Sequence, residues 1–294
     1  MSAAHWHVLG AGAVGCLFAS WLHRQQVAVT LLLRDATAAG QDPVVIERGS
    51  TTESCHIPLE GSTAESPISH LLVTTKAYDV SPAVAAIGHR LQANTRILLL
   101  SNGIGLIEEL RAAGLSNRLY CGTTTEGAYR LGPRHIRHAG TGQTLIGMPR
   151  NQRTAAQLPD EDRHHAPAWA QQWSAAIPRC QWEPDIDSAL WRKLAINCAI
   201  NPLTALNRCP NGALAERPEL AERVDQVCRE ISRISDAAGF GEVAASLHQG
   251  VAAVIRGTSA NRSSMLQDLE AGRRTEIEYI TGQLLKIARQ HDIP

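Results

Sequence analysis

The hexapeptide Gly10-Ala11-Gly12-Ala13-Val14-Gly15, a GxGxxG motif close to the amino terminus, is the feature that most restricts the fold. It directly follows an apolar run at residues 6–10 that is typical of a strand, and it opens a helical pattern at residues 13–24. In this context the glycines allow a tight turn, close approach of the backbone to a pyrophosphate, and tight packing of helix on strand. The helix amino terminus adds free N–H groups and the positive end of its dipole. We therefore expect a dinucleotide-binding site here, with a glycine-rich structural turn as the alternative.

Beyond this motif, short apolar runs alternate with helical patterns through the first half of the chain. Further strands are expected at residues 27–33, 44–47, 71–75, 96–100 and 119–123, helices at 82–91 and 106–113, and a polar loop at 150–165. Such alternation is typical of a doubly wound, mostly parallel sheet. From Asp187 to the end, helical patterns dominate. We therefore predict an α/β Rossmann-type dinucleotide-binding domain over residues 1–184, followed by an all-α C-terminal domain over residues 185–294.

The composition excludes several classes of protein. The 28 basic residues equal the 28 acidic ones, so no electrostatic footprint for nucleic acid or for a membrane surface follows. No apolar run reaches the roughly 20 residues of a membrane helix, and no secretory leader is evident, which predicts a cytoplasmic protein. The seven cysteines are scattered and never spaced CxxC, so neither a zinc site nor a disulfide framework is expected. The adjacent His164 and His165 lie in a polar stretch, and we assign no metal to them.

The strongest indication of chemistry is a helical run, KLAINCAINPL, over residues 193–203. Its side chains with polar groups are those of Lys193, Asn197 and Asn201, which are four apart and so lie near one face of a helix. Since burial of an ammonium and two carboxamides costs free energy unless each has a partner, a wet ligand-binding cleft is one explanation. The ordinary alternatives are a lysine that extends to solvent and amides bonded to the backbone. Pro202 is expected to kink or end the helix.

Polar residues also follow the predicted strands of the first domain, where ligands bind in open parallel sheets. Lys76 and Asn102 each follow one of these strands, so both are expected to border the cofactor. A solvated lysine and a plain Asn-Gly turn are the alternatives. At the end of the second strand, Arg34 is suited to a 2′-phosphate, whereas Asp35 is suited to the ribose hydroxyls of NAD. These two residues alone leave the choice between NADP and NAD open.

In order and spacing, the motifs resemble those of the ketopantoate reductases, also called 2-dehydropantoate 2-reductases. The GxGxxG motif, the strand-end arginine, Lys76 and Asn102-Gly103 are followed by WRKLAINCAINPLTAL, CPNG, SSMLQD and TEIEYITG. The similarity covers essentially the whole chain, and its later motifs are far more discriminating than the first. Members of this family reduce ketopantoate to pantoate with NADPH on the route to pantothenate and coenzyme A.

The resemblance implies a role for each matching residue. Lys193 would donate a proton to the substrate, and Glu276 would complete the catalytic pair. The residues implied in substrate binding are Asn102, Asn197, Asn201, Asn211 and Ser264. Those implied in binding NADP(H) are Gly10, Ala11, Gly12, Ala13, Val14, Gly15, Arg34, Lys76, Asn102 and Glu276. The expected protein is an NADP-dependent oxidoreductase that acts on a small molecule, as a monomer or a homodimer.

The residues leave two other functions open. One is an NADP-dependent reductase of another small 2-oxo acid or an imine, and the other is a catalytically idle NADP-binding regulator. The presence of both Lys193 and Glu276 argues against the idle protein. Purely structural roles also fit single residues, since Ser263 or Ser264 would cap a helix and an acidic Glu276 is favourable in a first helical turn.

Overall fold

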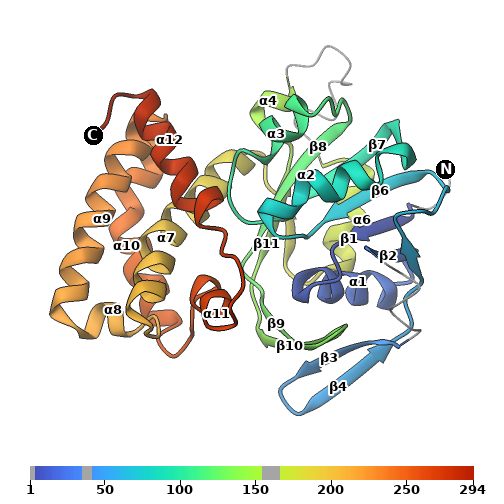
Figure 1. Cartoon of the computed structure of the whole chain (residues 1–294), viewed down its shortest axis with the longest axis horizontal. Coiled ribbons are helices and arrows are strands. Elements are labelled where there is room, and N and C mark those ends of the chain that lie inside the picture. The colour runs from blue at the N-terminus through green and yellow to red at the C-terminus, as the bar shows by residue number, and fades with distance from the viewer. Residues whose placement is uncertain (1–3, 35–41, 154–165) are drawn as a thin grey trace. The chain divides into compact units, whose positions relative to one another are not determined.

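The computed structural model describes residues 4–34, 42–153 and 166–294 (Figure 1). The chain divides into two compact units, the first made of Met1–Ser101 and Leu106–Asp187 and the second of Asn102–Gly105 and Ser188–Pro294. The four residues 102–105 therefore pack with the helical unit, although they lie between two elements of the first unit in the sequence. Within the described residues, no helix is both long and apolar enough to cross a membrane.

An eight-stranded sheet forms the centre of the first unit, in the order β12-β11-β8-β7-β6-β1-β2-β5. Its strands are Trp6–Leu9 (β1), Val29–Leu33 (β2), Leu59–Gly61 (β5), Ile68–Val73 (β6), Leu91–Leu99 (β7), Arg118–Thr124 (β8), Thr144–Gly147 (β11) and Cys180–Trp182 (β12). From β5 to β8 all neighbours pair in parallel, whereas β11 is antiparallel to β8. The predicted doubly wound α/β fold is confirmed.

Helices connect these strands and cover the sheet, which is why the central strands are apolar along their whole length. The helices of this unit are α1 (Ala13–Arg24), α2 (Ala77–Ala86), the short η1 (Gly88–Arg90), α3 (Leu106–Ala112), α4 (Arg150–Arg153) and α6 (Ala168–Ala176). Every residue of β1 is buried, as are the last four of β6. These are the runs that indicate strands in the sequence.

A second sheet, of four strands, packs against α1 (Figure 1). Its order is β4-β3-β10-β9, with strands Val44–Arg48 (β3), Thr51–Cys55 (β4), Gly127–Gly132 (β9) and His135–Gly140 (β10). The strand expected at residues 44–47 thus exists as β3, but it belongs to this smaller sheet and not to the main one. Trp21 of α1 meets His138 of β10 edge-on, with ring centroids 5.7 Å apart.

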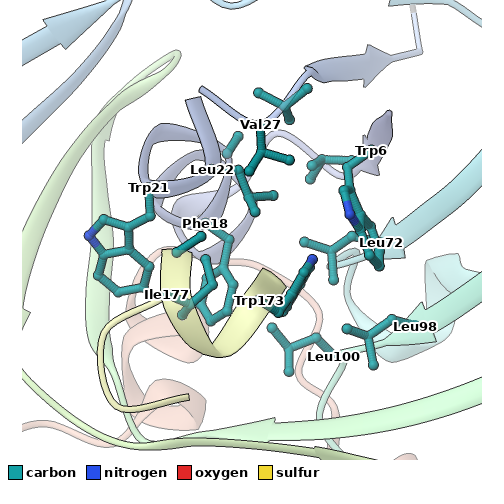
Figure 2. Packing of buried hydrophobic residues seen from close by; sticks show 14 of the residues in the cluster. Trp6, Phe18, Trp21, Leu22, Val27, Leu72, Leu98, Leu100, Trp173 and Ile177 are labelled. Carbon is teal, nitrogen blue, oxygen red and sulfur yellow. The ribbon is translucent and has the colours of Figure 1, made fainter. Parts of the chain in front are cut away.

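The core of the first unit is built around aromatic rings (Figure 2). Trp173 of α6 lies against Trp6 of β1 and Phe18 of α1, with ring centroids 4.7 and 5.9 Å apart. All three rings are fully buried. Burial of such large apolar surfaces supplies the main driving force for packing α1 and α6 on the same face of the sheet.

The second unit is helical. Its elements are α7 (Ile186–Asn207), α8 (Ala213–Glu216), α9 (Pro218–Ala237), α10 (Gly241–Gly257), α11 (Ser264–Glu270), a π-helical turn η2 (Glu278–Gly282) and α12 (Gln283–Gln290). Trp191 of α7 stacks on Phe240, which precedes α10, and donates its indole N–H to Ser235 of α9 at 2.9 Å. These contacts join α7 to the pair formed by α9 and α10. The predicted all-helical second part is confirmed.

Of the two outcomes expected at Pro202, a kink or an end of the helix, the end is wrong, because α7 continues to Asn207. A proline inside a helix costs about 3 kcal/mol. Burial of one large aliphatic side chain contributes about 1.5–3 kcal/mol, and Ile200 and Leu203, on either side of the proline, are both buried. Tertiary packing therefore outweighs the local preference, and Asn201 lies on a continuous helix.

The helix expected at residues 82–91 is also misplaced. It begins five residues earlier, at Ala77, and Pro82 lies within it instead of at its start. The buried side chains Ala77, Val80 and Val84 form the apolar stripe that fixes this helix against the sheet. Part of the loop expected at 150–165 is helix α4, and its remainder, from residue 154, lies outside the described residues.

Candidate functional site

The glycine motif forms a tight turn between β1 and α1. Gly10 has φ +112°, a backbone conformation that favours glycine. A Cβ on Gly15 would lie 2.0 Å from the carbonyl oxygen of Gly10, so only glycine allows the helix to approach the strand. Gly12 opens α1 and has no atom within 4 Å of where a Cβ would be. Open space at Gly12, on the axis of a helix amino terminus, is the feature needed for close approach of a phosphate.

The neighbouring strand β6 supports this turn. The hydroxyl of Thr74 donates to the carbonyl oxygen of Gly10 at 2.8 Å. Two residues further on, Lys76 occupies the position that immediately precedes α2. The hydroxyl of Ser101, which follows β7 and Leu100, donates to the carbonyl oxygen of Thr75 at 2.7 Å. The turn at Gly10 and the segment just before Lys76 are therefore held by two hydroxyls, those of Thr74 and Ser101, that the sequence motifs do not include.

Arg34 directly follows β2 and is exposed. It lies at the carboxyl end of the strand beside β1, where the adenosine ribose binds in dinucleotide-binding folds. Asp35, the alternative partner for a ribose, lies outside the described residues.

Helix α7 carries Lys193, Asn197 and Asn201 on consecutive turns. Lys193 and Asn197 are half-buried and Asn201 is buried. Leu194 and Ala195, which point elsewhere, belong to the apolar core of the second unit. The predicted helix with one polar row in an apolar surrounding is therefore present.

The charge of Lys193 is modified by its surroundings. Burial lowers the pKa of Lys193 from its ordinary value of 10.5 to about 8, and the negative charge of Glu276 opposes part of this decrease. Glu276 itself is buried, with 4% of its surface exposed. It immediately precedes the last helical stretch of the chain, and its carbonyl oxygen accepts from Tyr279 and Ile280. A carboxylate at a helix amino terminus is stabilised by the helix dipole.

Asn102 reaches the same carboxylate. Its Nδ2 donates to Oε2 of Glu276 at 3.3 Å. Three of the predicted site residues thus interact in the second unit: Lys193 and Glu276 through their charges, and Asn102 and Glu276 through a hydrogen bond.

Asn211 belongs to a second polar group of this unit. Its Nδ2 donates to Oγ1 of Thr258 at 2.8 Å, and its backbone N–H donates to the carbonyl of Asn261. Its Oδ1 is buried and has no hydrogen-bond partner among the described residues. A buried amide oxygen without a donor is costly in free energy unless a ligand or water supplies one.

Ser264 differs from the other predicted substrate residues because it is exposed, at the first position of α11. Its neighbour Ser263 caps that helix by accepting from the N–H of Leu266 at 3.1 Å. The hydroxyl of Thr204, one turn after Asn201 on α7, donates to Ser263 at 2.7 Å. Sequence reasoning missed Thr204, for which the only signal was its place in the polar–apolar pattern of the helix.

Comparison with known proteins decides the family. Residues 6–151 match the family model described as "Ketopantoate reductase PanE/ApbA", and residues 185–294 match "Ketopantoate reductase PanE/ApbA C terminal". The chain belongs to the ketopantoate reductase family. A 2-dehydropantoate 2-reductase from Yersinia pestis is 40% identical over 292 residues, which are 97% of this chain and 88% of that protein.

Solved structures share the fold of this ketopantoate reductase family member. A PanE/ApbA family ketopantoate reductase from Ralstonia eutropha JMP134 has a TM-score of 0.83 and 25% identity, covering 99% of this chain and 93% of that one. D-mandelate dehydrogenase, solved with NADH and anilino(oxo)acetate, has a TM-score of 0.85 and 20% identity, with the same coverage. The protein is an oxidoreductase with a nicotinamide dinucleotide as cofactor.

Proposed function

We propose that this protein reduces 2-dehydropantoate (ketopantoate) to pantoate with NADPH. The relative from Yersinia pestis carries the name of that activity, and the two family models together extend over both units. The observation that carries the proposal is Lys193, a half-buried lysine at the start of the polar row on α7, with its pKa lowered to about 8 and the Glu276 charge acting on it. Such a group is suited to donate a proton near neutral pH.

The residues of the first unit fit a dinucleotide. Open space at Gly12 leaves the amino terminus of α1 accessible to a pyrophosphate, and the missing side chains at Gly10 and Gly15 allow the tight turn and the close packing of α1 that place it there. We assign the rest of the motif and Lys76 to the same cofactor, which when bound supplies the hydride. We assign the exposed Arg34 to the 2′-phosphate, which favours NADPH over NADH.

Lys193 is the proposed acid. Addition of hydride to the 2-oxo carbon leaves negative charge on the carbonyl oxygen, and a nearby ammonium both stabilises that charge and supplies the proton. With a pKa of about 8, the ammonium form predominates at neutral pH, yet it gives up its proton more readily than an ordinary lysine. Glu276 keeps the ammonium charged despite its burial.

The asparagines are the proposed substrate ligands. Asn102, Asn197, Asn201 and Asn211 offer donors and acceptors without adding charge, so that Lys193 remains the dominant cation. The unpartnered Oδ1 of Asn211 is suited to accept from a substrate hydroxyl. Ser264, exposed at the start of α11, is assigned to the substrate by its place in the family motif.

The test is the rate of NADPH oxidation with ketopantoate, compared with pyruvate, 2-oxoisovalerate and 2-oxoglutarate. The proposal expects the highest kcat/KM with ketopantoate, because the second unit supplies neutral hydrogen-bonding groups for a hydroxyl besides the 2-oxo acid. Equal kcat/KM for all four compounds would reject the substrate assignment. Tight NADPH binding without oxidation by any of them would reject the enzymatic assignment.

A further inference from the structure

The second unit contains one π-helical turn, Glu278–Gly282, at the start of its last helical stretch. In a π turn the backbone bonds run from residue i to i+5 in place of i+4. A change of bonding register leaves a carbonyl oxygen at the changeover available to a donor outside the helix. The carbonyl of Tyr279, within this turn, accepts from the backbone N–H of Ile104 at 3.3 Å.

The segment 102–105 fits closely against this turn. Gly103 has φ +88°, and a Cβ there would lie 2.4 Å from the carbonyl oxygen of Tyr279. Gly105 has φ +89°, and a Cβ there would lie 2.9 Å from the side-chain nitrogen of Gln283. Both glycines are therefore favoured by conformation, and Gly103 is also required for space, because its Cβ would meet backbone atoms of Tyr279. The plain Asn-Gly turn considered from the sequence would require only the conformation.

We propose that Gly103 and the π turn form a backbone latch that positions Asn102 on Glu276. The latch consists of the Ile104–Tyr279 hydrogen bond and the side-chain-free approach of Gly103 to the same carbonyl. Asn102, directly before it, donates to Glu276, which lies three residues before Tyr279. The charge of Glu276 in turn acts on Lys193. By fixing Asn102 on Glu276, the latch therefore acts indirectly on the proposed acid. The functional part of this inference rests on the proposed function.

Gly103→Ala tests the latch, with Gly239→Ala as the matched control. Gly239 has φ +84° and belongs to the same unit, but nothing lies within 4 Å of where its Cβ would be. Both variants carry a similar conformational strain, and only Gly103→Ala pushes against Tyr279. We expect kcat/KM for ketopantoate to fall on the order of 10²-fold in Gly103→Ala, since displacement of a positioned group by about 1 Å has that effect. Gly239→Ala should retain the wild-type kcat/KM.

Combining Gly103→Ala with Asn102→Ala distinguishes a positioning role of Gly103 from a merely structural one. If Gly103 acts only through Asn102, Gly103→Ala should cause no further loss of kcat/KM in an Asn102→Ala background. An equal loss in both backgrounds, or no loss in either, would overturn the proposal. If Gly103→Ala fails to fold, Gly105→Ala is tested in the same two backgrounds, because its Cβ meets only the movable end of the Gln283 side chain. A smaller loss that again disappears without Asn102 is expected.

Amide hydrogen exchange tests the latch independently of activity. The Ile104 N–H should be protected in the wild-type protein and in Gly239→Ala, and should exchange rapidly in Gly103→Ala. This result would support the latch even if the wild-type protein proved inactive with ketopantoate, in which case only the proposed function fails. Unchanged protection of Ile104 in Gly103→Ala would overturn the latch itself.

Discussion

Nδ2 of Asn102 donates to Oε2 of Glu276 at 3.3 Å, although the two residues are 174 positions apart in the sequence. The bond joins the residue after Ser101, which follows β7 and Leu100, to the residue that precedes the last helical stretch. Both residues belong to the helical unit. The Glu276 carboxylate, which accepts this bond, also raises the pKa of Lys193. The protonation state of the proposed acid therefore depends on three separate parts of the chain.

The pH dependence of the reaction should report Lys193. Reduction requires the ammonium form, which is lost as pH rises through its pKa of about 8. We expect kcat for ketopantoate reduction to be constant below this pH and to fall about tenfold per pH unit above it. Pantoate oxidation requires the neutral amine and should increase over the same interval. Initial rates at saturating substrate measure both directions; a flat reduction rate up to about pH 10 would contradict this role.

Gly12→Ala should weaken cofactor binding without destabilising the protein. A Cβ at Gly12 meets no protein atom within 4 Å, so the fold has room for it. The same Cβ would obstruct close approach of a pyrophosphate. We expect the Kd of NADPH to increase about tenfold or more, which corresponds to about 1.4 kcal/mol. Calorimetric titration measures this Kd, and Gly88→Ala, which also enters open space, is the control that should bind normally.

Arg34→Gln tests the choice of cofactor. Loss of a charge-assisted bond to the 2′-phosphate should raise the KM for NADPH about tenfold or more and leave the KM for NADH nearly unchanged. Arg24→Gln, which removes another exposed arginine of the same unit, should change neither value. A parallel increase in both KM values for Arg34→Gln would show that Arg34 does not distinguish the cofactors.

Two buried histidines should make the first unit sensitive to acid. Burial, the largest cause in each case, lowers the pKa of His7 and of His70 from 6.5 to about 4. The unfolded chain therefore binds more protons between these values, and stability that is complete above about pH 6.5 is lost as pH falls toward 4. The loss amounts to at most ~3 kcal/mol per histidine.

Urea unfolding at neutral and at mildly acidic pH measures this loss. His7→Gln and His70→Gln should each reduce the difference in unfolding free energy between the two pH values. His291→Gln, at an exposed position near the carboxyl end, should not. If all three variants keep the wild-type difference, carboxylates and not these histidines account for the acid sensitivity.

The main sheet could be predicted from the sequence because β1, β2 and β6 are buried on both faces and so appear as apolar runs. The second sheet could not. Every residue of β4 except Cys55 is exposed, and no residue of β9 is fully buried, so neither has the alternation of buried apolar residues that indicates a strand. Their pairing with β3 and β10 depends on contacts between distant segments, which local sequence patterns do not indicate.

For the candidate site, the polar row on α7 could be predicted because four-residue spacing is a local property of a helix. The Asn102–Glu276 bond could not, because no local pattern relates residues so far apart. Likewise, Pro202 and the π turn at Glu278–Gly282 depend on packing that overrides the backbone preference of each segment. The family motifs identified Asn102 and Glu276 separately, and the structure adds their contact.

The most direct measurement of the central claim is kcat for ketopantoate reduction by NADPH in Lys193→Ala, compared with Lys286→Ala. Lys286 is an exposed lysine of α12 and provides the same chemical change away from the proposed acid. We expect Lys193→Ala to lower kcat by roughly 10²-fold or more, and Lys286→Ala to retain the wild-type value. A near-normal kcat in Lys193→Ala, with ketopantoate as substrate, would contradict the account.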